Sequence, residues 1–262
     1  MLHPTLTIAL KAARNAGDII LRSLEFLDRI TFTTKGVNDY VSEVDRLAEK
    51  EIISVIRHSF PHHAILAEET GHHAGDDHVW IIDPLDGTTN FMHGIPHFCV
   101  SIALQYKGRI EHGLVYDPVR QEVFSASRGH GAQLNEKRMR VSKVAALNAA
   151  LLSTGFPYQQ YDLLAPYMKI FQELLPICAG LRRAGSAALD LAYVAAGRHD
   201  GFWEFNLKPW DIAAGALLIK EACGLVGDIY GGENYLETGH IVAGNPKLFK
   251  QLLQVIKPVV SP

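Results

Sequence analysis

The chain of 262 residues has few cysteines and no long hydrophobic run. Its three cysteines, Cys99, Cys178 and Cys223, form no C-x-x-C pair and lie in apolar contexts. We therefore expect three buried free thiols, which excludes a disulfide scaffold and favours a reducing compartment. The longest uncharged stretch, Val144 to Tyr161, is interrupted by Asn, Gly, Pro and Gln. It falls short of the roughly 18 continuous apolar residues that a membrane span needs.

The first residues also lack the layout of a secretory signal. A short apolar run from Thr5 to Leu10 precedes Lys11 and Arg14, whereas a signal peptide carries its positive charge first and ends in a small-residue cleavage site. We expect a cytoplasmic protein that does not enter a membrane.

An excess of charge of either sign is missing as well. Lys plus Arg total 25 and Asp plus Glu total 28, which gives a net charge of −3. This balance argues against generic nucleic-acid binding, although it leaves a local basic patch open. Hydrophobic types make up 48% and charged types 20% of the residues, which is typical of a globular protein and excludes extensive disorder.

The pattern of apolar residues divides the chain into two halves. Steps of three and four from Leu6 to Leu27 and from Val44 to Ile56 predict two amphipathic helices, and Ser42 with Asp45 resembles a capping box before the second. Strands are predicted next, with short turns that imply antiparallel neighbours, at residues 64–67, 79–82, 98–106, 110–116 and 121–126.

After about Val144 strands and helices alternate. A strand is predicted at residues 150–153, and helices at 163–175, 187–196, 212–223 and from Pro246 onward. We predict an α+β half over residues 1–143 and an α/β half over 144–262. No flexible linker separates them, so they are expected to pack as one rigid unit.

The densest chemical signal is the segment from Trp80 to Asn90. An apolar strand ends there in two carboxylates, Asp83 and Asp86, around a proline. Gly87, Thr88 and Thr89 follow and offer successive backbone N–H groups that bind anions at a helix start. Ligands for a hard cation beside an anion cradle predict a metal-phosphate site. The simpler interpretation, an Asx turn with a capping threonine, has about equal weight on this segment alone.

Other acidic residues are also candidate ligands for a metal or a substrate. Glu68-Glu69 follows a short apolar strand, Glu204 lies in an aromatic segment, and Asp211 stands at a predicted helix start. Taken singly, a Glu pair in a loop is usually solvated, and an aspartate at a helix start is a cap more often than a metal ligand. Their combination decides between these interpretations.

In combination, three blocks resemble the signatures of the inositol monophosphatase family. They are Glu68-Glu69, Asp83-Pro84-Leu85-Asp86-Gly87-Thr88-Thr89-Asn90 and Trp210-Asp211-Ile212-Ala213-Ala214-Gly215. The resemblance runs nearly end to end, and the segment from Arg182 to Arg198 is most similar to the bacterial SuhB type. It implies an α+β fold, a layered αβαβα sandwich, and hydrolysis of phosphate monoesters with two to three Mg²⁺ ions.

The resemblance also implies a role for each matched residue. Glu68, Asp83 and the carbonyl of Leu85 would hold one metal; Asp83, Asp86 and Asp211 a second; and a third, looser ion would share Glu68. Thr88 would orient the attacking water, with Asp45 accepting its hydroxyl proton, although helix capping by Asp45 has equal weight. The expected substrate-binding residues are Asp86, Gly87, Thr88, Arg182, Gly185, Ser186, Ala187, Glu204 and Asp211.

Three activities remain open at this stage. The first is a lithium-sensitive inositol-1-phosphatase that acts on myo-inositol 1-phosphate, and the second is a related phosphatase for fructose 1,6-bisphosphate, histidinol phosphate or a 3′-phosphonucleotide. The third, implied by the SuhB type, is a factor that works with the transcription machinery in antitermination. The family also implies a homodimer. The pairs His62-His63 and His72-His73 match no zinc spacing and are given no metal role.

Overall fold

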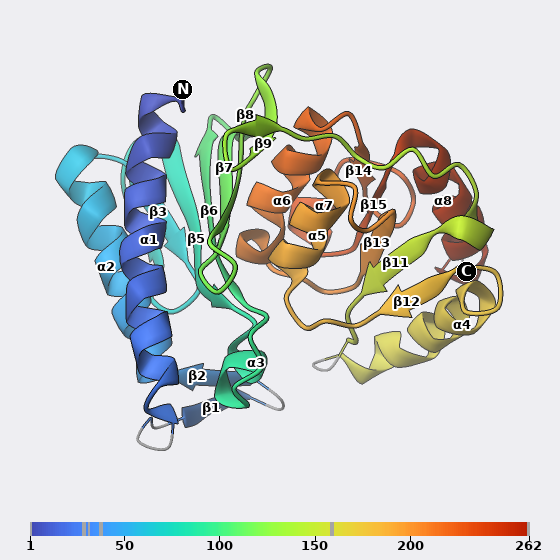
Figure 1. Cartoon of the computed structure of the whole chain (residues 1–262), viewed down its shortest axis with the longest axis horizontal. Coiled ribbons are helices and arrows are strands. Elements are labelled where there is room, and N and C mark those ends of the chain that lie inside the picture. The colour runs from blue at the N-terminus through green and yellow to red at the C-terminus, as the bar shows by residue number, and fades with distance from the viewer. Residues whose placement is uncertain (1, 28–29, 31, 37–38, 158–159, 261–262) are drawn as a thin grey trace.

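The computed structural model describes residues 2–27, 30, 32–36, 39–157 and 160–260, and its helices and sheets form five layers (Figure 1). Helices α1 (Pro4–Leu24) and α2 (Glu43–Ser59) cover the outer face of an eight-stranded sheet. Helices α5 (Ala187–Ala195) and α6 (Pro209–Glu221) lie between that sheet and a five-stranded one, and α4 (Leu164–Leu174) and α8 (Pro246–Val260) lie beyond it. The predicted αβαβα sandwich is confirmed.

The eight-stranded sheet has the order β10-β9-β8-β7-β6-β5-β3-β4. Its strands are β3 (Ala64–Ala67), β4 (Gly71–His73), β5 (His78–Asp86), β6 (Cys99–Tyr106), β7 (Arg109–Asp117), β8 (Glu122–Ser127), β9 (Gly131–Leu134) and β10 (Lys137–Arg138). Strands β6, β7 and β8 pair antiparallel as their short turns predicted. Strand β5 also pairs antiparallel with β6, β9 with β8 and β10 with β9, and β3 runs parallel to β5. Ala67 pairs with Ile82, so Glu68, directly after β3, lies beside Asp83 within β5.

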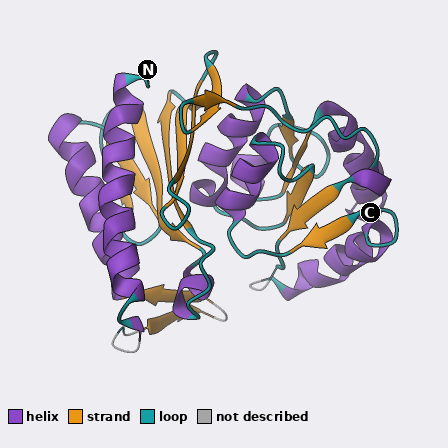
Figure 2. Ribbon diagram, viewed as in Figure 1, coloured by secondary structure: helices purple, strands orange, loops and turns teal. Residues whose placement is uncertain are grey.

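The five-stranded sheet has the order β12-β11-β13-β15-β14. Its strands are β11 (Leu151–Thr154), β12 (Gly180–Arg182), β13 (Gly201–Glu204), β14 (Leu225–Gly227) and β15 (Ile241–Gly244). The hairpin β1 (Phe32–Gly36) and β2 (Asp39–Ser42) and the short helix α3 (Thr88–Met92) lie below α1 at the bottom of the view in Figure 2. The short helix α7 (Tyr235–Thr238) contacts α6. Single 3-10 turns lie at Leu147–Ala149 and Tyr161–Leu163.

The two central helices, α5 and α6, contain many small side chains because a sheet covers them on each side. In α5, residues Ala187 to Ala192 and Val194 to Ala195 are buried, and in α6 every residue from Ile212 to Ile219 is buried. A Cβ at Gly215 would lie 2.5 Å from the Cβ of Leu191, so glycine there lets the two helices approach closely. This tight central layer holds the first turns of both helices against β5 and β6.

The cysteine prediction was partly wrong. All three cysteines are free, but only Cys99 is buried; Cys178 is half-buried and Cys223 is exposed. Cys223 follows the last turn of α6 with a left-handed φ of 68°, and that turn directs the chain to the surface. In the described part of the chain, no helix has the length and apolar character to cross a membrane.

Candidate active site

A β-bulge brings the two aspartates of β5 to one side of the strand. Asp83 pairs with Ser101 and Asp86 with Cys99, so two residues of β5 oppose one residue of β6 between these pairs. Side chains three positions apart point to opposite faces of a regular strand, and the extra residue restores a common face. Pro84 lies in the bulge, where its missing N–H breaks no ladder bond.

Three donors converge on one carboxylate oxygen of Asp86. Its Oδ2 accepts hydrogen bonds from Ser186 Oγ and the backbone N–H of Ala188, both at 2.7 Å, and a longer one from Cys99 Sγ at 3.9 Å. These donors come from the start of α5 and from β6. They hold the Asp86 carboxylate in the group that it forms with Asp83 and Asp211.

Asp211 reaches the same site from the first turn of α6. The backbone N–H of Lys208 donates to its Oδ2 at 2.7 Å, which satisfies the predicted capping role. The Asp211 carboxylate also lies close to Asp83 and Asp86: one ligand oxygen from each of the three aspartates lies within 4.8 Å of the others. Helix capping and a place in the acidic cluster are therefore compatible.

The clustered acids raise one another's pKa. Burial, followed by the charges of Glu68, Asp86 and Asp211, raises the pKa of Asp83 well above its usual value. Burial and the charge of Asp86 do the same for Asp211. Burial raises the pKa of Asp86 as well, against the opposing hydrogen bonds from Ser186 and Ala188. The unfavourable approach of these carboxylates is what a bound cation relieves.

Glu68 lies at the edge of this cluster. Its backbone N–H donates to the carbonyl of Ile82 at 3.2 Å, directly before Asp83, so the loop after β3 is tied to β5. The Glu68 side chain hydrogen-bonds Asp83 and contributes to raising its pKa. The structure thus places Glu68 beside Asp83, as the ligand set of the resemblance requires.

Thr88 and Asp45 form the hydrogen-bonded pair that the resemblance implied. Thr88 Oγ1 lies 2.9 Å from Asp45 Oδ1 and 3.1 Å from the carbonyl oxygen of Leu85, both of which can accept its proton. The other carboxylate oxygen of Asp45 accepts from the backbone N–H of Ser42 at 2.8 Å and completes a capping box for α2. Asp45 therefore both caps α2 and hydrogen-bonds Thr88.

The helix after the aspartates is a single turn. Gly87 precedes α3 with a φ of 104°, a left-handed conformation that glycine adopts without strain. Leu85 donates its N–H to Asp83 Oδ1 at 2.9 Å, so the Asx turn of the simpler interpretation is present as well. Asn90, also from this block, donates to the carbonyl of Ala184 at 2.9 Å and so ties the block to the loop before α5.

A cavity of about 130 Å³ opens beside the three aspartates. Its lining includes six of the predicted substrate-binding residues: Asp86, Gly185, Ser186, Ala187, Glu204 and Asp211. Ser186 caps α5 by accepting from the N–H of Leu189. Gly87 and Thr88, at the start of α3, lie outside this lining.

Five residues that line the cavity were not predicted as site residues from the sequence: Thr154, Gly155, Arg183, Asp190 and Leu207. A Cβ at position 155 would lie 1.9 Å from Glu204 Oε1, so only glycine leaves room for that carboxylate. Arg183 lines the cavity, whereas the predicted Arg182 is exposed on β12 and outside the lining. No local sequence pattern marks these residues as part of a site, because it is the packing of separate strands and helices that brings them together.

Glu204 and Asp190 make this wall acidic. Burial, then the charges of Asp190, Asp211 and Asp86, raises the pKa of Glu204 well above its usual value, and Arg183 opposes that shift. Asp190 is 1% exposed, and its Oδ1 has no hydrogen-bond partner in the described part of the chain. Carboxylates of this kind are acceptors for the hydroxyl groups of a polyol.

The donor set fits magnesium. Carboxylate oxygens and a backbone carbonyl are the ligands that Mg²⁺ takes in proteins. Within the described residues, Asp83, Asp86 and Asp211 make no ion pair with a lysine or arginine. A divalent cation would supply the missing positive charge.

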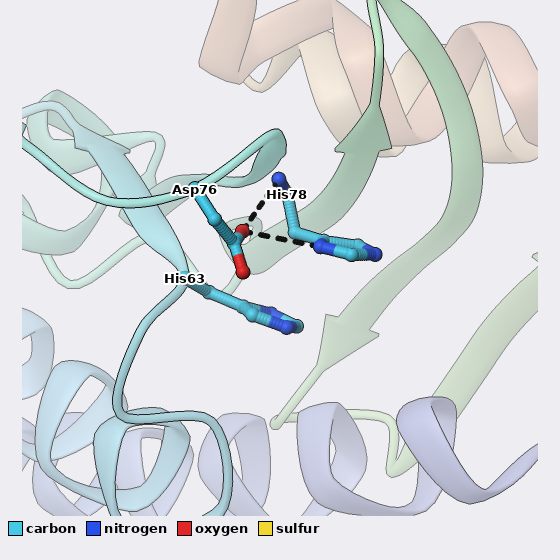
Figure 3. A group of neighbouring side chains, drawn as sticks. All are labelled: His63, Asp76 and His78. Atoms are coloured by element: carbon cyan, nitrogen blue, oxygen red, sulfur yellow. Dashed lines mark hydrogen bonds and ion pairs between the residues drawn. The ribbon is translucent and has the colours of Figure 1, made fainter.

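A second group of possible ligands lies at the opposite end of β5 (Figure 3). It comprises His63, Asp76 and His78, a grouping that sequence spacing did not show. Trp80 Nε1 donates to His63 Nδ1 at 3.0 Å, which leaves the proton of the neutral ring on Nε2. The two imidazoles stack at 4.4 Å and 10°, so their in-plane lone pairs run parallel and do not converge on one ion. As placed, these side chains stabilise the turn before β5.

Comparisons with known proteins agree with this geometry. The model of the inositol monophosphatase family matches residues 1–260. The protein named Nus factor SuhB from Pseudomonas aeruginosa is 57% identical, over 100% of this chain and 98% of its own length. The protein of the same name from Escherichia coli is 52% identical, over 99% and 98%.

Solved structures show the same relationship. The extragenic suppressor protein SuhB from Bartonella henselae has a TM-score of 0.95 and 42% identity, over 97% of this chain and 99% of its own. An inositol monophosphatase from Anabaena has a TM-score of 0.86 and 38% identity, over 97% and 95%.

Proposed function

The chain belongs to the inositol monophosphatase family, and we propose that it is a Mg²⁺-dependent phosphomonoesterase that hydrolyses myo-inositol 1-phosphate. The observation that carries this proposal is the convergence of Asp83, Asp86 and Asp211 within 4.8 Å beside a cavity with an acidic wall. Hydrolysis of a phosphate monoester is among the slowest uncatalysed reactions, so it needs strong stabilisation of negative charge.

Five residues would hold the two to three metal ions: Glu68, Asp83, Leu85 through its carbonyl, Asp86 and Asp211. When bound, paired divalent cations activate a water and stabilise the leaving oxygen of an in-line displacement. The protein holds these carboxylates before a metal binds: Oδ2 of Asp86 accepts from Ser186 and Ala188, and Oδ2 of Asp211 accepts from the N–H of Lys208.

Thr88 orients the attacking water in this proposal. Its hydroxyl donates to Asp45 Oδ1, which leaves a lone pair on Oγ1 that can accept a hydrogen bond from the water and so orient it. Asp45 is held on its other side by the N–H of Ser42, so the direction of the Thr88 hydroxyl is fixed before substrate binds. Backbone N–H groups at Gly87 and Thr88 would bind phosphate oxygens.

The wall of the cavity would bind the alcohol part of the substrate. Glu204 accepts hydrogen bonds from vicinal hydroxyl groups, and the segment Gly185–Ser186–Ala187 together with Asp86 and Asp211 lines the remainder. We retain Arg182 as an expected contact at the edge of this wall. A second phosphate group on the substrate would meet the carboxyl oxygens of Glu204 and Asp190, which are acceptors like the phosphate itself, and this favours a polyol monophosphate over a bisphosphate.

The test is phosphate release from myo-inositol 1-phosphate, fructose 1,6-bisphosphate and histidinol phosphate, with Mg²⁺ and with EDTA. We expect hydrolysis of the inositol substrate that disappears with EDTA and in Asp83→Asn. The matched control is Asp18→Asn, an exposed change on α1, which should retain full activity. If the metal-loaded protein leaves the inositol phosphate intact, the proposed specificity is wrong.

A second function is favoured by the names of the relatives. Proteins 57% and 52% identical over their whole length carry the name Nus factor SuhB, so we also propose an association with the transcription machinery in antitermination. In cells deleted for their own copy, the yield of full-length ribosomal RNA is measured after expression of this chain or of Asp86→Asn. Rescue by the inactive variant would show that this role does not need catalysis; failure of both would contradict it.

Three further properties follow from family membership as proposals. The protein would be a cytoplasmic homodimer, and Li⁺ would inhibit it by occupying a position that Mg²⁺ leaves. Light scattering after size-exclusion chromatography measures the mass of the assembly, and phosphate release in LiCl against KCl measures inhibition. A monomeric mass, or equal rates in both salts, would contradict the respective proposal.

A further inference from the structure

Helix α2 contributes a second buried carboxylate to the loops of the site. Glu49 is 1% exposed and lies four residues, one helical turn, after Asp45 on the same face. Its Oε2 accepts the backbone N–H of Glu69 and its Oε1 accepts that of Thr70, both at 2.8 Å. One helix face therefore holds both loops, since Asp45 contacts Thr88 and Glu49 contacts the residues directly after Glu68.

This contact is specific for a carboxylate. Burying a charged group is costly unless hydrogen bonds compensate, and Glu49 receives two charge-assisted bonds from successive amides. A glutamine in its place offers one acceptor, and its NH₂ group would then face an N–H donor. The loop after β3 must therefore shift or leave one polar group without a partner when Glu49 is replaced.

The position of this loop sets the position of Glu68. The Glu68 N–H is bound to the carbonyl of Ile82, and the next two N–H groups are bound to Glu49. Together they fix the peptide planes on both sides of the Glu68 Cα, and hence the direction of its side chain. Mg²⁺ demands near-ideal octahedral geometry, so a small rotation of this peptide weakens coordination by Glu68.

We propose that Glu49 is a positioning residue, which acts through the amides of Glu69 and Thr70 to hold Glu68 in the direction needed for metal binding. The proposal deepens the proposed phosphatase function and rests on it for the identity of the metal. Partners of this kind that orient a ligand typically change metal affinity about 10–100-fold when they are mutated.

The experiment titrates Mg²⁺ calorimetrically into substrate-free protein and measures the Mg²⁺ concentration for half-maximal phosphate release. In Glu49→Gln we expect metal affinity to fall about 10-fold or more, with kcat recovering at high Mg²⁺ because every ligand is still present. The matched control is Glu51→Gln, on the same helix, whose carboxylate accepts from Asn15 at 2.8 Å. This control should bind Mg²⁺ as the parent protein does.

A purely structural role would give a different result. In that case Glu49→Gln lowers the melting temperature but leaves Mg²⁺ affinity within twofold of the parent, and the proposal is overturned. If Glu49→Gln does not fold, Glu49→Asp, one methylene shorter, is titrated in its place with the same expectations. If neither variant folds, amide exchange of Glu69 and Thr70 in the parent decides, because reciprocal coupling requires Mg²⁺ to slow it; unchanged exchange overturns the proposal.

The outcomes also separate this proposal from the proposed function. A parent that binds Mg²⁺ but releases no phosphate would contradict the phosphatase activity. The calorimetric comparison of Glu49→Gln with Glu51→Gln would still test the positioning role.

Discussion

Replacing Asp86 by asparagine removes one negative charge from the site and leaves the shape of the side chain almost unchanged. Two donors, Ser186 Oγ and the N–H of Ala188, converge on Oδ2 of Asp86. An asparagine can accept both only with its carbonyl oxygen in that position, and its NH₂ group then faces Asp83 and Asp211. We therefore expect Asp86→Asn to fold normally while losing a metal ligand.

The same substitution should stabilise the protein without metal. Ligand oxygens of the three aspartates lie within 4.8 Å of one another, and two unit charges at about 4.8 Å repel by roughly 3.5 kcal/mol at an effective dielectric constant of about 20. Protonation relieves much of this, because the pKa values of Asp83 and Asp211 are raised. Allowing for that and for solvent screening, we expect Asp86→Asn to gain about 1–2 kcal/mol and about 2–5 °C in Tm at neutral pH.

Thermal unfolding in EDTA and in saturating Mg²⁺ measures both effects. The parent should be the less stable protein in EDTA and should gain more from Mg²⁺, since a ligand stabilises only the state that binds it. The control is Asp117→Asn, a buried aspartate paired with Arg120 at 2.9 Å, which should lose stability and retain the Mg²⁺ response. The reasoning is refuted if Asp86→Asn has a lower Tm than the parent in EDTA, or if Mg²⁺ raises the Tm of both proteins equally.

Three other predictions concern the wall, the water and a buried histidine. Gly155→Ala would place a Cβ 1.9 Å from Glu204 Oε1 and displace that carboxylate. We expect KM for myo-inositol 1-phosphate to rise about 10-fold, because the substrate loses roughly one hydrogen bond to a charged group. Hydrolysis of p-nitrophenyl phosphate should be unchanged. Thr88→Val should lower kcat about 100-fold or more and Thr88→Ser should restore it, with Mg²⁺ affinity unchanged in calorimetry; a Val variant with normal kcat would exclude a role in orienting water. Burial lowers the pKa of His199 to about 4, so its neutral form stabilises the fold above about pH 6.5 and this contribution is lost as the pH falls toward 4. Urea unfolding should show a loss of about 2 kcal/mol between pH 7.5 and 5 from this group, absent in His199→Gln.

Features encoded in a few consecutive residues could be predicted from the sequence. The ends of α2, the antiparallel strands from β5 to β8 and the start of α8 at Pro246 agree with their periodicity and caps. The block around Asp83 and Asp86 was recognisable because an apolar strand ends there in acids and small residues. The extra length of β5, which continues to Asp86, was missed because a bulge depends on pairing with β6.

Exposure of single residues was less predictable. Cys223 lies in an apolar segment, yet the turn after α6 exposes it, since its environment depends on where the chain leaves the helix. Glu49 shows the opposite case. A glutamate on a helix is usually solvated, and only the proximity of two loop amides explains its burial.

Local sequence thus decided which residue types could bind a metal and a phosphate, because strand ends, caps and tight turns depend on neighbours in the chain. Only the tertiary structure decided which of these residues meet. Packing of α5 and α6 between two sheets brings Asp211 and Ser186 to Asp86, and the adjacent strands β11 and β13 bring Gly155 to Glu204. Such contacts join segments that are far apart in the chain, and their geometry comes from close packing of the layers.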